Sequence, residues 1–141
     1  MSAQNRRLHL LMIIPILLSV TFSEAKPRRT QRMQAGTWGA PHIRLEVSQS
    51  SAAIEYDCAR GTINGPLALD RRGRFSLTGT HIREHGGPIR DNESANSQPA
   101  RYTGTIAGQT MNLTVTLADT NEVIGKFRLE RGAPGRVFKC R

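Results

Sequence analysis

Apolar and polar side chains alternate along most of this chain, most regularly in its last third. Between residues 111 and 117 every second residue is apolar, and each intervening residue is Asn or Thr. Successive side chains of a β-strand point to opposite faces, so a period of two predicts a strand buried on one face. We find no segment with the 3.6-residue period of an amphipathic helix. The fold is therefore predicted to be all-β.

Turn residues divide the alternating chain into short segments. Residues 107–108 are typical of a two-residue hairpin turn, and residues 119–121 and 132–135 of further turns. Short strands with hairpin-length links predict a small antiparallel up-and-down β-barrel of about eight strands, because closure removes the exposed edges of the meander. The expected strands cover residues 43–47, 54–58, 63–69, 75–82, 102–106, 111–117, 123–129 and 138–140. Their inward phase carries the aromatic residues Tyr56, Phe75, Tyr102, Phe127 and Phe138.

Glycines are expected to interrupt this pattern at two places. Gly61 is predicted to end the second strand. Ile82 lies on the outward phase of its strand, and a bulge near Gly79 would return it to the inward phase. Asn64-Gly65-Pro66 predicts a bend within the third strand.

Trp38 is the only tryptophan of the chain and stands just before the first regular strand. A side chain of this size at the mouth of a small barrel is suited to filling one of its ends. We therefore predict that Trp38 is a buried structural plug. The competing interpretation is an exposed platform on which a ligand stacks.

The tripeptide Gly36-Thr37-Trp38 resembles the Gly-x-Trp opening of the lipocalins and avidins, which are eight-stranded meander barrels. In lipocalins this Trp packs against a basic residue from the last strand, and the resemblance implies that Arg128, Arg136 or Lys139 takes that place. Biotin-binding proteins line their pocket with several tryptophans, whereas this chain has one. Biotin binding is therefore not expected.

A wider pattern resembles a family of small secreted bacterial proteins with no established activity. It consists of Gly-Thr-Trp-Gly, His-Ile-x-Leu-Glu-Val, Ile-Glu-Tyr-Asp-Cys-Ala, Gly-Arg-Phe and Arg-Glu-His-Gly-Gly-Pro. The likeness spans most of the chain after residue 25. It implies a recurring domain and no particular chemistry.

Residues 1–25 have the features of a secretory signal peptide. A basic start at residues 6–7 precedes an apolar stretch at residues 10–20, and residues 23–25 supply small side chains at the cleavage positions. The alternative is an uncleaved membrane anchor. The apolar stretch is shorter than a membrane-spanning helix requires, and it contains Pro15. The mature protein is thus expected to be secreted or periplasmic in a bacterium, without a transmembrane segment.

Cleavage would leave a basic arm and one β-barrel domain. The arm covers residues 26–35, lacks periodicity, is expected to be flexible, and carries the cations Lys26, Arg28, Arg29 and Arg32. The domain covers residues 36–141. The net charge of the whole chain is +9. The arm is interpreted either as a solubilising tail or as a contact for an anionic partner.

Cys58 and Cys140 are the only cysteines, and both follow the signal segment. Two thiols in an oxidising compartment predict one disulfide. The alternative is a pair of separate buried thiols.

The string His81-Ile82-Arg83-Glu84-His85 matches the H-x-x-E-H pattern of inverted zinc proteases. That pattern needs a helix to bring its ligands onto one face, whereas glycines flank it here on both sides. A looser metal site would use His81, His85 and His42. The expected interpretation is outward polar residues at a barrel rim, with no metal and no cofactor.

Enzymatic activity is not expected, because we find no nucleophile elbow and no phosphate-binding loop. Nucleic-acid binding is not expected either, because the aromatic residues lie on the inward phase rather than on an exposed basic face. Two functions remain. In the first, the barrel interior binds a small hydrophobic ligand at the end opposite Trp38. In the second, a packed barrel contacts an anionic envelope component through its basic arm and the loop at residues 85–100.

The signal assignment predicts that the exported protein begins at Lys26, because the preceding tripeptide has the small residues that signal peptidase reads. N-terminal sequencing of the exported protein tests this directly. A sequence that begins at Met1 or Ser2 would indicate an uncleaved anchor.

Overall fold

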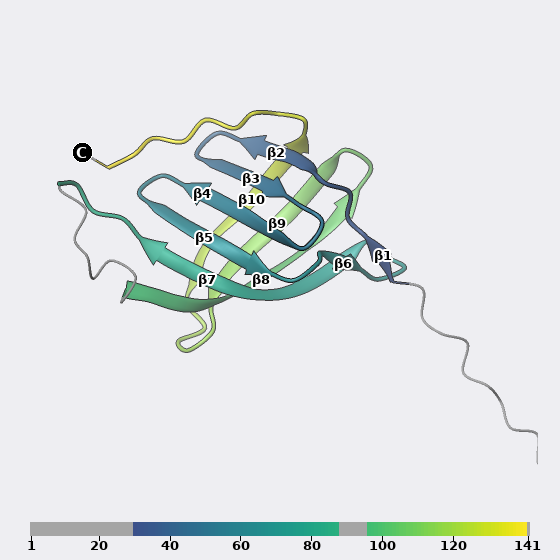
Figure 1. The fold of residues 1–141 in the computed structure, drawn as a ribbon, viewed down its shortest axis with the longest axis horizontal. Helices are drawn as coiled ribbons and strands as arrows, with labels where there is room; N and C mark the ends of the chain where they lie inside the picture. The colour runs from purple at the N-terminus through teal and green to yellow at the C-terminus, as the bar shows by residue number, and fades with distance from the viewer. Residues whose placement is uncertain (1–29, 88–95, 141) are drawn as a thin grey trace, which may run out of the picture.

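A computed structural model describes residues 30–87 and 96–140 of the chain (Figure 1). The predicted signal segment 1–25 and the arm cations Lys26, Arg28 and Arg29 lie outside the described residues, as do residues 88–95 of the 85–100 loop. Among the residues that are described, no helix is long and apolar enough to cross a membrane.

Eight antiparallel strands form a closed barrel, in the order β10-β2-β3-β4-β5-β7-β8-β9. The predicted barrel and its disulfide, Cys58–Cys140, are thereby confirmed. Two further short strands, β1 and β6, pair with each other outside the barrel. The strands are β1 (Gln31–Arg32), β2 (Gly36–Ala40), β3 (Ile43–Val47), β4 (Ser51–Tyr56), β5 (Ala59–Asn64), β6 (Ala68–Leu69), β7 (Arg74–Arg83), β8 (Ser97–Ala107), β9 (Thr110–Leu117) and β10 (Val123–Arg131).

The alternating pattern places one side of each strand inside the barrel. Along β3 and β9 the apolar residues are buried, and the residues between them are exposed or half-buried. Burial of the inward side chains stabilises the fold through the hydrophobic effect. The side chains that are less than 2% exposed include Tyr102, Ile43, Leu45, Ile54, Ile63, Met111, Leu113, Val115 and Leu129.

The first hairpins differ from the expected strand boundaries. Trp38 lies within a strand of its own, β2, which pairs with both β3 and β10. The chain turns at Asp57 and Cys58 rather than at Gly61, and Cys58 adopts a φ of 55°. The prediction that Gly61 ends a strand is therefore wrong. Gly61 lies inside β5, where a Cβ would collide with the hydroxyl of Tyr102.

The expected third strand, residues 63–69, is divided between two sheets. Its first part belongs to β5, and its last part is β6, which pairs with β1. Strand β1 lies within residues 26–35, the segment expected to be a flexible arm. The N–H of Met33 donates to the carbonyl oxygen of Leu67 at 2.8 Å, and Met33 packs against the core. These contacts attach residues 31–33 to one end of the barrel.

Strand β7 is continuous, so the predicted bulge near Gly79 is wrong. Its register with β8 runs without a shift from Arg74–Thr105 to Ile82–Ser97. Ile82 keeps its outward phase and is half-buried. A side chain at Gly79 would collide with the carbonyl of Thr62, so the glycine allows β5 and β7 to approach closely.

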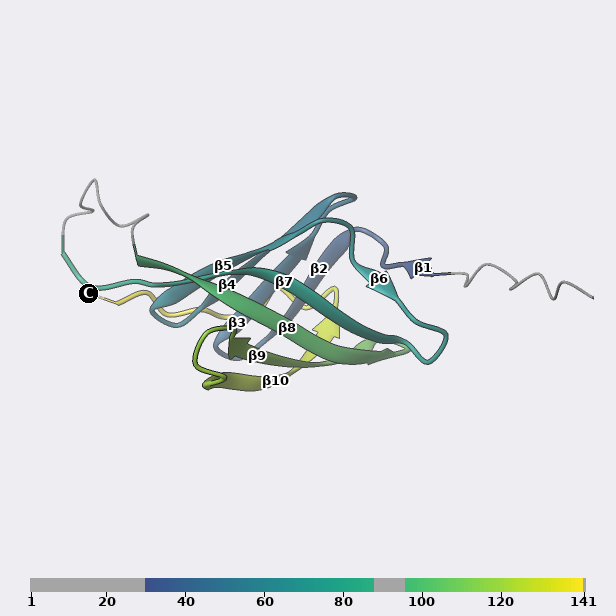
Figure 2. The ribbon, with the colours of Figure 1, turned by 90° about the horizontal axis from the view of Figure 1, so that it is seen from below.

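Residues 132–140, which we name the C-terminal strap, cross one end of the barrel instead of forming the predicted last strand (Figures 1 and 2). The strap passes the β2–β3 turn and the β4–β5 turn, and Cys140 bonds to Cys58 with the two Cα atoms 4.9 Å apart. Phe138 is 55% exposed, so its predicted inward position is wrong. The reason is that the strap is not a barrel strand and has no inward phase.

Hydrogen bonds from the strap reinforce the short pairing between β10 and β2. Only two register pairs, Glu130–Gly39 and Arg131–Trp38, join these strands. The strap adds hydrogen bonds from the N–H of Gly132 to the carbonyl of Thr37 at 2.7 Å and from the N–H of His42 to the carbonyl of Arg136 at 2.7 Å. The strap therefore extends the contact that closes the barrel.

Replacement of both cysteines by Ala should lower the free energy of unfolding by about 4 kcal/mol, because the bond closes a long loop in the unfolded chain. Urea denaturation measures the change. Reducing agent should bring the parent protein to the stability of the double variant and leave that variant unaffected. If non-reducing peptide mapping instead recovers two alkylated thiols, the bridge is absent.

Candidate functional site

Buried and mostly apolar side chains pack together inside the barrel. The cavities along residues 30–87 and 96–140 include four of about 280 to 610 Å³, and all four are lined from the outer face or from an end of the barrel. Small-molecule sites usually occupy concave spaces of about 300–1,000 Å³. The binding chemistry of this protein is therefore to be sought on its faces and ends.

Three polar side chains lie within the otherwise apolar interior. The hydroxyl of Tyr102 donates to the carbonyl oxygen of Thr80 at 2.6 Å. The hydroxyl of Tyr56 and Nδ1 of His81 are buried without a hydrogen-bond partner among the described residues. The rings of Tyr56 and His81 are 5.7 Å apart between centroids.

His81 is 2% exposed, so the expected outward position at a barrel rim is wrong for this residue. Because β7 contains no bulge, His81 keeps the inward phase of Phe75. It lies opposite Gly61 of β5 in the barrel sheet. Because glycine has no side chain, Gly61 leaves room for the hydroxyl of Tyr102.

Burial governs the titration of these groups. Desolvation lowers the pKa of His81, the charge of Arg83 lowers it further, and Glu122 acts in the opposite direction. Burial also raises the pKa of Tyr56 and of Tyr102. His81 is therefore a neutral imidazole at neutral pH, because a buried positive charge would lose its hydration.

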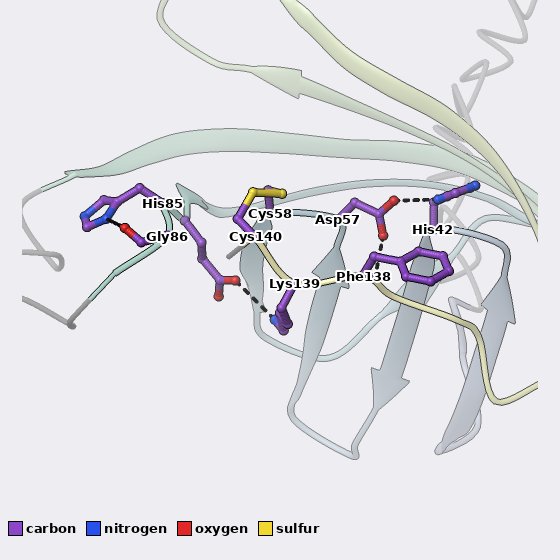
Figure 3. The surroundings of a disulfide bond; sticks show 9 residues. His42, Asp57, Cys58, His85, Gly86, Phe138, Lys139 and Cys140 are labelled. Atoms are coloured by element: carbon purple, nitrogen blue, oxygen red, sulfur yellow. Dashed lines mark hydrogen bonds and ion pairs between the residues drawn. A yellow bond between two sulfur atoms is a disulfide. The ribbon is translucent and has the colours of Figure 1, made fainter.

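The histidines named as metal candidates occupy three different environments. His81 is inside the barrel, whereas Nδ1 of His42 lies 2.5 Å from Oδ2 of Asp57 on the outside. Nδ1 of His85 lies 3.1 Å from the carbonyl oxygen of Gly86. Figure 3 shows His42 and His85 on opposite sides of the disulfide. Residues 30–87 and 96–140 contain no group of three or more His, Cys, Asp or Glu placed to hold a metal ion.

Asp57 joins the strap to the β4–β5 turn. Its Oδ1 accepts a hydrogen bond from the N–H of Phe138 at 2.7 Å, and this bond, followed by the contact with His42, lowers the pKa of the carboxyl group. The ring of His42 lies 5.8 Å from that of Phe138 between centroids. Figure 3 shows this group beside the disulfide, where Lys139 reaches Glu84 at 3.2 Å. The arrangement holds the strap against the β4–β5 turn.

Trp38 is 2% exposed and lies toward the end of the barrel that β1 and β6 cover. Its cross-strand partner on β10 is Arg131, which the sequence analysis did not name. Of the three basic residues that were named, Arg128 pairs with Glu130 at 3.7 Å, and Arg136 and Lys139 belong to the strap. Arg131 lies two residues beyond Leu129, on the same phase of β10, and this spacing was the signal available in the sequence.

The outward side of β7, β8, β9 and β10 forms a surface rich in hydroxyl groups, which we name the threonine face. Strand register arranges its side chains in rows across the sheet. The first row is Arg74, Thr105, Asn112 and Arg128, the second is Ser76, Thr103, Thr114 and Lys126, and the third is Thr78, Arg101 and Thr116. All eleven side chains are exposed or half-buried.

The two sides of the barrel differ in charge. The three rows of the threonine face contain four cations and no carboxylate, and at their border Asp70 pairs with Arg74 and Glu130 of β10 pairs with Arg128. No ion pair between described residues involves Arg101 or Lys126. On the opposite side, Arg44 pairs with Glu46, Arg60 pairs with Glu84, and Glu55 adds a further carboxylate. Positive charge is therefore concentrated on the threonine face.

No family model, no curated protein and no solved structure matches this chain. The resemblances to lipocalins, to avidins and to a secreted bacterial family therefore stay predictions, and the observed barrel establishes the fold alone. The basic arm is likewise untested as a contact, because only Arg32 of its cations lies among the described residues, in β1.

Stability should decrease as the pH falls from 7 to 5. Because the pKa of folded His81 lies below its ordinary value of 6.5, the unfolded chain binds the proton first, and each pH unit costs at most about 1.4 kcal/mol. Urea denaturation across this range measures the slope. The variant His81→Leu should reduce the slope of stability against pH, whereas the control His85→Gln, at an exposed site, should leave that slope unchanged. An unchanged slope in His81→Leu would contradict the assignment.

Proposed function

We propose that this protein is an exported, non-enzymatic binding protein whose packed barrel holds the threonine face against an acidic polysaccharide of the cell envelope. The observation that carries the proposal is the registered set of three rows, each of which combines hydroxyl groups with one or two cations, while carboxylates are confined to the border.

The chemistry of the rows matches the two kinds of group on an acidic sugar chain. Hydroxyl groups of Thr and Ser both donate and accept hydrogen bonds, as sugar hydroxyls do. Guanidinium and ammonium groups pair with carboxylates, and Arg does so through two parallel hydrogen bonds. Arg101 and Lys126 have no ion pair among the described residues that would have to break first.

The geometry of the sheet suits an extended polymer. Adjacent strands of a sheet lie about 4.8 Å apart, and outward residues along one strand repeat about every 6.7 Å. The three rows thus offer a nearly regular grid of polar groups. A repeating chain can contact several positions at once, so weak single contacts add up to a useful affinity.

Other anionic partners fit this face less well. Binding at a lipid surface uses apolar side chains that enter the bilayer boundary. Of the exposed large hydrophobic residues, Phe138 belongs to the strap, and Val123 is a single apolar side chain that pairs with Thr116 at the edge of the third row. Single-stranded nucleic acid is bound by stacking on exposed aromatic rings. None of the eleven residues in the rows is aromatic.

The double variant Arg101→Gln/Lys126→Gln should bind polygalacturonate about five- to tenfold more weakly, because each exposed charge contact contributes up to about 1 kcal/mol. Titration calorimetry at low salt measures the loss. The control Arg44→Gln/Arg60→Gln removes the same charge from the opposite side and should bind like the parent protein. Neutral dextran should not bind.

A third variant separates polysaccharide recognition from simple charge attraction. Thr103→Val/Thr114→Val keeps the charge and nearly the shape of the second row but removes two hydroxyl groups. It should also weaken binding to polygalacturonate. Equal losses in the control pair of arginines, or equal binding of dextran, would overturn the proposal. Competition by anionic phospholipid vesicles that the threonine variant leaves unchanged would favour a membrane partner instead.

A further inference from the structure

A cavity of about 330 Å³ opens at the end of the barrel covered by β1 and β6. Figures 1 and 2 show that these two strands lie at the end opposite the one that the strap crosses. The cavity does not belong to the threonine face. Five different strands contribute to its lining: β1, β2, β6, β8 and β10. The residues that matter for its chemistry are Arg32, Met33, Trp38, Leu69, Ile106 and Arg131.

The polar part of this lining is positive. Arg32 and Arg131 line the cavity together, and none of the lining residues is acidic. Nη2 of Arg131 donates to Oε1 of Gln34, another lining residue, at 2.8 Å. That bond positions the guanidinium and leaves its other donors available, because the group has five N–H donors in all.

Trp38 contributes its large apolar ring to the lining of the cavity. The indole is 2% exposed, and its Nε1 is buried without a hydrogen-bond partner among the described residues. A buried N–H without an acceptor is destabilising and is rare in folded proteins. Because Nε1 is enclosed by protein atoms, a ligand in the cavity meets the indole ring rather than this N–H.

The remaining wall is apolar. Leu69 is buried in the core, and Met33 and Ile106 pack against it. Met33 has a flexible unbranched side chain that adapts to the shape of a neighbouring group. The cavity therefore combines two cations with an apolar wall within one small volume.

From these groups we infer that the cavity binds a small carboxylate with a short alkyl tail. The carboxylate accepts hydrogen bonds from Arg32 and Arg131. The tail lies along the ring of Trp38 and along Met33, Leu69 and Ile106. The volume is at the lower end of the range for small-molecule sites, which suits a chain of about six to eight carbons.

The single tryptophan of the chain provides a direct measurement, because Trp38 lines the cavity. Titration of the mature protein with 8-bromooctanoate should quench the tryptophan emission in a saturable manner, since bromine quenches an indole on contact. Octanoate without bromine should displace the probe. Hexanoate should compete less well, by up to about fourfold for each methylene lost. Octylamine, which carries the opposite charge, should not compete.

Variants test the assigned contacts. Arg131→Gln and Arg32→Gln should each weaken 8-bromooctanoate binding at least fivefold, with circular dichroism unchanged from the parent protein. Arg101→Gln/Lys126→Gln, on the threonine face, should bind the probe normally. If the parent protein binds the probe but not polygalacturonate, the proposed function fails. If it binds polygalacturonate but not the probe, the inference about the cavity fails.

Absence of saturable quenching by 8-bromooctanoate at millimolar concentration would overturn the inference. Equal displacement by octylamine would overturn the assignment of a carboxylate. Should either arginine variant fail to fold, the octylamine and hexanoate competitions with the parent protein still decide the question.

Discussion

The structure depends on how the barrel is closed. Edge strands expose unpaired backbone groups, and a barrel avoids this only if its first and last strands pair. Here β2 and β10 share two register pairs, and the C-terminal strap supplies the rest of the contact through hydrogen bonds to residues 37–42 and the Cys58–Cys140 bond. A Cβ at Gly39 would collide with the backbone of the strap, so a glycine at this position lets the strap lie directly on β2.

A filled core limits where function can be located. The centre holds residues such as Tyr102, Met111 and Leu129, which are fully buried, and a ligand there would have to displace them. Interiors of this kind are packed densely, and removal of a large buried side chain costs about 2–5 kcal/mol. Recognition must therefore use side chains that the alternation directs outward or the openings at the barrel ends. The proposed polysaccharide surface and the proposed carboxylate cavity occupy these two kinds of position.

The alternating pattern predicted the strands well because burial on one face leaves a direct trace in the sequence. It failed where the cause lay in contacts between distant segments. The alternation predicts interruptions at Gly61 and Gly79, but each glycine allows a close approach to a neighbouring strand, and that neighbour cannot be identified from local sequence. Phe138 fits an inward phase, yet the disulfide and the hydrogen bond to Asp57 hold it outside. Similarly, Arg131 is recognised as the partner of Trp38 only once the β2–β10 register is known.

The threonine face could not be predicted from the sequence either, because it depends on the pairing of distant strands. Each of its strands, taken alone, has ordinary solvent-facing Thr, Ser and Arg residues, and single exposed residues of this kind carry no signal. The rows arise only when β7, β8, β9 and β10 are placed in register, which brings Thr103 beside Ser76 on one side and Thr114 on the other. The excess of positive charge arises in the same way, because Arg74, Arg101, Lys126 and Arg128 come from three different strands and share one side of the barrel only through the strand register. A binding surface on a β-barrel is therefore a property of strand pairing, and the pairing is the information that sequence periodicity lacks.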